Sequence, residues 1–129
     1  MPFLIALFCM ICLDLIWFAL IARQFYFQQL GNILRLSEGK LHPHYPAAIM
    51  VYILLALGIV YFVLPKTQGS LFYALLFGAL FGLITYGVYD FTNLATLQNW
   101  SLKVTLVDAA WGMFTCAVTS VVTLFLTRQ

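Results

Sequence analysis

The sequence predicts an all-α, polytopic membrane protein: a single domain, residues 1–129, in which a bundle of four helices crosses the bilayer. Its 129 residues are 64% hydrophobic and only 8% charged, which is too apolar for a soluble domain of this size. Four apolar runs reach, or nearly reach, the ~20 residues that a helix needs to cross hydrocarbon. They span residues 3–22, 47–64, 71–93 and 104–126.

The first run is interpreted as a retained transmembrane helix and not as a signal peptide. It lacks a charged segment at its start, and it contains Asp14 and large aromatic side chains where a signal peptide has small residues.

The connection at residues 23–46 is predicted to include a helical segment that lies in the membrane interface. Tyr26, Leu30, Ile33 and Leu34 fall on one face of a helix, whereas the polar residues Gln28, Gln29, Asn32 and Arg35 lie off that face. A solvated loop is the alternative that the sequence leaves open.

Metal binding is not expected from the histidines or the cysteines. His42 and His44 form a pair without a third ligand nearby, which favours surface positions over a metal site. Cys9 and Cys12 are interpreted as small hydrophobic residues, and Cys116 lies at membrane depth, so no disulfide framework is expected. No motif indicates a cofactor, and none is expected.

The remaining connections indicate how the helices are arranged. Residues 65–70 have turn chemistry and are too few to do more than join two antiparallel neighbours. The basic residues favour the side of the first and third connections, which predicts both termini outside the cytoplasm. The side of the first and third connections carries Arg23, Arg35, Lys40 and Lys103, and the opposite side carries Lys66 and Arg128.

Three aspartates indicate where function resides. Asp14, Asp90 and Asp108 lie within the apolar runs, and no lysine or arginine lies inside those runs to neutralise them. An ionised carboxylate at the centre of a membrane helix costs ~3 kcal/mol even on a lenient scale. All three lie toward the side of the first and third connections, so one cavity is expected to hold them.

Helical periodicity places further polar residues with these carboxylates. In the third run a stripe of small residues leads to Tyr86, Asp90 and Asn93, which predicts a face buried against protein. The tetrapeptide Asp-x-x-Trp occurs twice, so that an indole N–H can donate to the neighbouring carboxylate or across to another helix. The predicted ligand- or proton-binding residues are Asp14, Trp17, Tyr86, Asp90, Asn93, Thr105, Asp108 and Trp111.

Two motifs in the third and fourth runs are distinctive. The first extends from Tyr86 to Leu97 and is followed by Trp100, and the second extends from Val107 to Gly112. Together they resemble the signature of domain-of-unknown-function family 2177. Asp14 and Trp17 extend the resemblance to the first helix. The chain departs from the family pattern in Phe18, where leucine is usual, and in Ser101, where proline is usual. The resemblance implies a multi-pass protein of the bacterial inner membrane, but no reaction, because the family has no assigned activity.

Three functions agree with these observations. The first is proton- or cation-coupled binding or transport of a small solute, with a homodimer as the working unit. The second is a membrane-embedded enzyme acting on a lipid or isoprenoid, with an aspartate as general acid or base and Tyr86 or Tyr89 as its partner. The third is an accessory subunit of a membrane complex.

The expected partners are the lipid bilayer and a small cation, a proton or a lipid-like ligand. Nucleic acid is not expected, because the net charge is only +2 and no basic stripe is present. The aspartates also have a purely structural interpretation, in which hydrogen bonds to them fix the register of the helices without transport or catalysis.

Overall fold

The computed structural model describes residues 1–30, 36–37, 40–41 and 44–128, and its elements are almost all helical. The prediction of a four-helix membrane bundle is confirmed. Four helices in the described part of the chain are long and apolar enough to cross a membrane. These are Pro2–Leu20, Tyr45–Thr67, Leu71–Thr96 and Leu102–Thr127.

The helix of the first crossing continues past the membrane span into the connection. α1 (Pro2–Ile16) continues without a break through the π-helical turn η1 (Trp17–Ala22) into α2 (Arg23–Leu30). On α2, Tyr26 and Leu30 are buried and pack with Val104 of the last helix. That face therefore contacts protein, whereas Ile33 and Leu34 lie outside the described residues.

The chain then returns to the bundle through a short strand pair, β1 (Leu36–Ser37) with β2 (Lys40–Leu41), which is antiparallel. His44 begins α3 (Tyr45–Gly58): its Nδ1 accepts a hydrogen bond from the backbone N–H of Ala47, at 3.3 Å. His44 is thus an exposed helix cap, and His42 lies outside the described residues.

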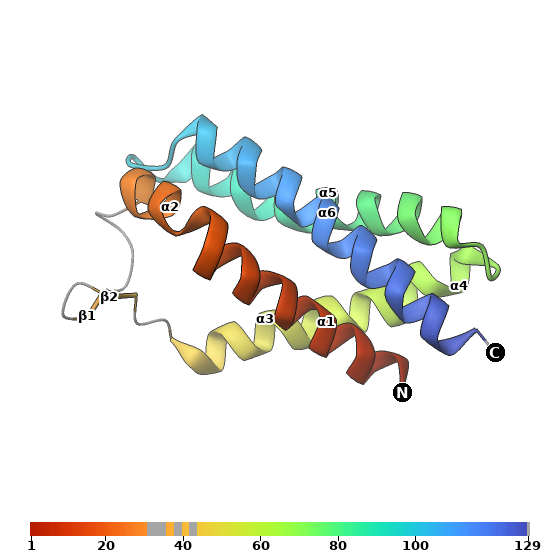
Figure 1. Ribbon diagram of the computed structural model, residues 1–129. Helices are drawn as coiled ribbons and strands as arrows, with labels where there is room; N and C mark the ends of the chain where they lie inside the picture. The colour runs from red at the N-terminus through yellow and green to blue at the C-terminus, as the bar shows by residue number, and fades with distance from the viewer. Residues whose placement is uncertain (31–35, 38–39, 42–43, 129) are drawn as a thin grey trace.

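The second crossing ends in a tight turn toward the third. α3 leads through the π-helical turn η2 (Ile59–Val63) into α4 (Leu64–Thr67), and Gln68 and Gly69 both have positive φ angles. In Figure 1 this turn lies at the same end of the bundle as both termini.

The last two helices form the tightest pair of the bundle. α5 (Leu71–Thr96) and α6 (Leu102–Thr127) pack along much of their length, and Ser70 and Ser101 cap their first turns. At Gly78 and Gly82 a side chain would collide with backbone atoms of α6, so only glycine permits this approach. Half of the apolar window of α6 is buried, against 11% of that of α1, which places α6 at the centre of the bundle.

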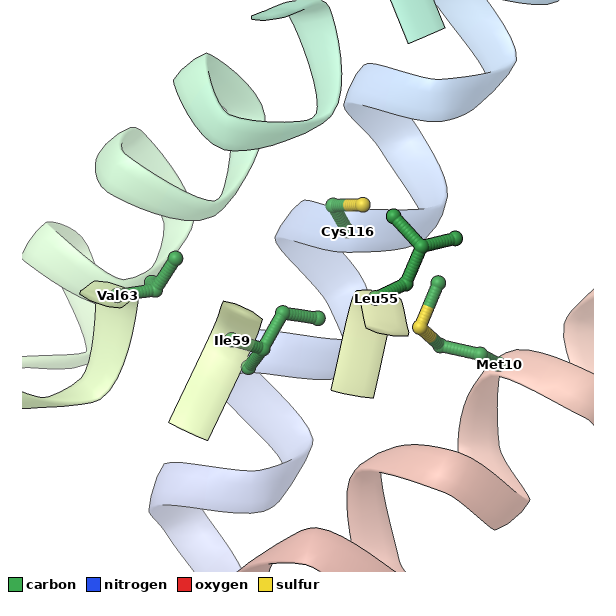
Figure 2. Packing of buried hydrophobic residues seen from close by; sticks show 5 residues of the cluster. All are labelled: Met10, Leu55, Ile59, Val63 and Cys116. Carbon is green, nitrogen blue, oxygen red and sulfur yellow. The ribbon is translucent and has the colours of Figure 1, made fainter. Parts of the chain in front are cut away.

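An apolar cluster closes the half of the bundle nearer the termini. It joins α1, α3, η2 and α6 through Met10, Leu55, Ile59, Val63 and Cys116 (Figure 2). The other half of the bundle, on the side of the connection between α1 and α3, contains the polar residues described next.

Candidate functional site

A cavity of about 430 Å³ lies among the four crossing helices. α1 and α6 each contribute one carboxyl group to it, from Asp14 and Asp108. The remaining lining comes from α3 and α5 and is apolar or aromatic apart from hydroxyl groups: Ala48, Val51, Tyr52, Leu55, Thr85, Tyr86 and Tyr89. Volumes of ~300 to 1,000 Å³ are typical of sites for small organic ligands.

Asp14 accepts hydrogen bonds from two other helices. The Tyr52 hydroxyl of α3 donates to Oδ2 at 2.6 Å, and the Trp111 indole N–H of α6 donates to Oδ1 at 2.7 Å. Both oxygens act only as acceptors, and the distances are as short as those of bonds to ionised carboxylates. The two donors therefore fix the position of the Asp14 carboxyl group between α3 and α6.

The two Asp-x-x-Trp sequences meet across the bundle. Trp17 and Trp111 stack face to face, with ring centroids 4.4 Å apart and an angle of 8° between the planes. Trp111 donates to the aspartate of the other tetrapeptide, Asp14, and not to Asp108 of its own. The indole thus bonds across to a neighbouring helix, one of the two arrangements that the sequence allowed.

Asp108 accepts a hydrogen bond from a side chain of α2. The Tyr26 hydroxyl donates to its Oδ1 at 2.8 Å, across 82 positions of sequence. Burial, and next the nearby Asp108 carboxylate, raise the pKa of Tyr26 above the ordinary tyrosine value. Tyr26 therefore stays neutral and remains a hydrogen-bond donor.

Asp90 is the most deeply buried of the three aspartates, with 0% of its surface exposed. Neither carboxyl oxygen has a hydrogen-bond partner within the described part of the chain. Asp90 interacts instead with the carboxyl group of Asp108, which lines the cavity. A hydrogen bond between these two carboxyl groups would require a proton between them.

A glycine makes room for one of the aromatic residues. A side chain on Gly112 would overlap the side chain of Tyr86, so the missing Cβ lets Tyr86 pack closely against α6, where it lines the cavity. Tyr89, one turn further along α5, packs edge-on against Trp100, with ring centroids 5.8 Å apart.

Five of the eight predicted site residues do not line the cavity: Trp17, Asp90, Asn93, Thr105 and Trp111. Asp90 and Trp111 interact with the aspartates that do line it, and Trp17 stacks on Trp111. The other two lie further away. Thr105 belongs to the first turn of α6, where its Oγ1 accepts from the Trp100 indole at 3.1 Å and donates to the Ser101 carbonyl at 3.0 Å. Asn93 lies one turn beyond Tyr89 on α5 and interacts with it. The geometry gives both residues a local structural role.

Two tyrosines that bond to the aspartates were absent from the predicted set. Tyr52 lies in a run that is otherwise almost wholly apolar, and its hydroxyl group at membrane depth was the available signal. Tyr26 was noted for its place on an amphipathic face, and the sequence gives no sign that it reaches Asp108.

A comparison with protein-family models decides the family. Residues 1–125 match the model described as "Predicted membrane protein (DUF2177)". The chain belongs to the DUF2177 family. The resemblance drawn from the motifs in α5 and α6 is thereby confirmed, and with it the description as an integral membrane protein. No curated protein and no solved structure matches the chain.

Proposed function

We propose that this DUF2177 protein binds a proton and a small cation in exchange for one another at Asp14, Asp90 and Asp108, and that the exchange serves to transport a small solute. The observation that supports this most directly is Asp90. Its carboxyl group is fully buried, has no hydrogen-bond partner among the residues that the structure describes, and lies next to a second carboxyl group, so it needs a proton or a cation to be stable at membrane depth.

The three carboxyl groups divide into a fixed charge and a proton-binding pair. Asp14, with two donors, provides the fixed negative charge. Asp90 and Asp108 share one proton, because two negative charges in contact repel each other strongly in a medium of low dielectric constant. This pair is the proton site of the proposal.

Exchange follows from the position of Asp108 between the cavity and Asp90. A cation that enters the cavity approaches Asp108 and replaces the positive charge of the shared proton, which then leaves. One charge enters and one leaves, so the net charge of the site is unchanged. The buried site therefore never has to hold an additional uncompensated charge, which would be costly.

A polar stripe on α6 supports movement of the proton toward the other membrane face. Thr115, Thr119 and Thr123 recur at four-residue intervals beyond Asp108, and all three are buried. Within the described residues, the hydroxyls of Thr115 and Thr123 have no hydrogen-bond partner, and neither does that of Ser120 beside them. Hydroxyl groups that can both donate and accept are suitable for passing a proton past the apolar cluster.

The proposal includes a location and an assembly. The resemblance of the motifs to family 2177 favours a location in the inner membrane of a bacterium. A homodimer is proposed because a single bundle of four helices is small for a path that opens alternately to the two faces of a membrane.

Proton movement in proteoliposomes tests the proposal. The protein is reconstituted into the membrane of vesicles that contain a pH-sensitive dye, and an inward concentration gradient of sodium, potassium or tetramethylammonium is imposed. We expect one of these cations to drive protons out of the vesicles, and the Asp108→Asn and Asp90→Asn variants to abolish the effect.

Thr96→Val is the matched control on α5, because Thr96 is exposed and its hydroxyl bonds only to the backbone carbonyl of Thr92, at 2.8 Å. This variant should behave as the wild type does. Proton movement that is equal in the wild type, in Asp108→Asn and in protein-free vesicles would contradict the proposal.

A further inference from the structure

The cavity opens sideways between α3 and α5. Its rim includes Val51 of α3, which is 52% exposed, and Tyr89 of α5, which is 54% exposed. The first half of the second crossing, α3, packs against α1, whereas contact with α5 comes mainly from η2 and α4. The two helices are therefore joined at the end nearer the termini and separate at the cavity.

In a membrane this opening faces hydrocarbon. The outward positions next to it on both helices are large apolar side chains, among them Leu54 on α3 and Ile84 and Val88 on α5, and all three are more than half exposed. Such surfaces are stable only against lipid tails or another apolar surface. A ligand can therefore pass between the lipid phase and the carboxylates without crossing the polar membrane surface.

The lining selects the chemistry of the ligand. Asp14 and Asp108 attract positive charge and repel an anion. The rings of Tyr52, Tyr86 and Tyr89 supply aromatic surface, which binds organic ammonium groups well and is a poor replacement for the water shell of an inorganic ion. Asp90 is fully buried, has no hydrogen-bond partner within the described residues, and interacts with the Asp108 carboxyl group, so a neutral ligand could not replace the proton that this pair is proposed to share.

We propose that the solute is an amphipathic organic cation, an alkylammonium, which enters from the bilayer between α3 and α5 and places its charged head at Asp14 and Asp108. Its apolar tail lies along Val51 and Leu55 and leaves through the opening. This inference rests on the proposed function, because it names the cation that exchanges with the proton.

Calorimetric titration of the protein in lipid nanodiscs tests the inference with three probes, each corrected for partition into empty nanodiscs. Octyltrimethylammonium has the charge and the tail, tetramethylammonium has only the charge, and octan-1-ol has only the tail. We expect octyltrimethylammonium to bind at least about tenfold more tightly than either of the others, and to release protons into the buffer as it binds.

Variants at the two ends of the proposed ligand test its placement. Asp14→Asn and Asp108→Asn should each weaken octyltrimethylammonium at least about tenfold. Ala48→Trp, at the rim of the cavity, should weaken it by blocking the opening. Its matched control is Ala47→Trp, because Ala47 is the preceding residue of α3 and is exposed but does not line the cavity.

The outcomes separate this inference from the function on which it rests. If tetramethylammonium binds as tightly as octyltrimethylammonium and binding depends on Asp108, the sideways route is wrong and cation exchange stands. If octan-1-ol binds as tightly, the ligand is a neutral lipid-like molecule and the inference is overturned. If octyltrimethylammonium binds Asp14→Asn, Asp108→Asn and the wild type equally, both proposals fail. Tyr52→Phe, which retains the ring, provides a milder variant should an aspartate variant not fold.

Discussion

Gly82 lies where the backbones of α5 and α6 are in contact, and replacing it with alanine tests the packing that positions the site. A Cβ atom at this position would overlap the carbonyl oxygen of Gly112 and would lie 2.9 Å from the Cα of Met113. Both are backbone atoms of a helix, so neither can rotate away as a flexible side chain could. The helices must separate, and α6 carries both Asp108 and the glycine against which Tyr86 lies.

The expected magnitude follows from two opposing contributions. Forcing an extra methyl group into a tightly packed contact costs ~1 to 3 kcal/mol, and the rigid neighbours favour the upper end of that range. Replacing glycine with alanine inside a helix stabilises the folded protein by ~1 kcal/mol, because alanine has the higher helix propensity. We therefore expect Gly82→Ala to lower the free energy of unfolding by ~2 kcal/mol.

Gly87 provides the matched control on the same helix. Apart from its chain neighbours and the nearby backbone of α5, no atom of the described residues lies within 4 Å of the Cβ that alanine would add there. Gly87→Ala should raise the free energy of unfolding by ~0.5 to 1 kcal/mol. The assay is equilibrium unfolding in mixed micelles of dodecyl maltoside and dodecyl sulfate, followed by circular dichroism. A Gly82→Ala variant as stable as Gly87→Ala would refute the close helix contact.

Two further predictions concern the tyrosines that bond to the aspartates. Tyr52→Phe, which removes one donor to Asp14, should lower the free energy of unfolding by ~0.6 kcal/mol and by no more than ~1.7. Tyr61→Phe, at a residue 68% exposed, should change little, and equal effects would count against the Asp14 bond. Stability should fall as the pH rises above ~10, because the unfolded chain ionises Tyr26 there while the fold keeps it protonated beside Asp108. Tyr26→Phe should lose less stability than the wild type over that range, as measured by unfolding at several pH values.

The four crossings were predictable because length and hydropathy alone determine which segments can span hydrocarbon. The same reasoning singled out Asp14 and Asp108, since a carboxyl group at membrane depth is conspicuous in any apolar run. Helical periodicity also placed Tyr86 with them. These inferences need only the sequence of one helix at a time.

The partners of the carboxyl groups were less predictable because they depend on how the helices are rotated about their axes. Tyr52 reaches Asp14 only because α3 packs against α1. Tyr26 reaches Asp108 only because α2 continues the first helix and packs against Val104 of α6. Thr105 shares the periodicity of Asp108, yet its hydroxyl bonds within its own end of the bundle. Periodicity identifies a face but does not determine which neighbour the face meets.

Infrared difference spectroscopy of the carboxyl groups tests the central claim most directly, because it detects the proton that Asp90 and Asp108 are proposed to share. Spectra of the reconstituted protein are recorded with and without octyltrimethylammonium at neutral pH. The account predicts a protonated-carboxyl band in the ligand-free protein that disappears on binding and is altered or absent in Asp90→Asn and Asp108→Asn. It predicts an unchanged band in Thr96→Val. A ligand-free protein without any protonated-carboxyl band, or a band unaffected by both aspartate substitutions, would contradict the account.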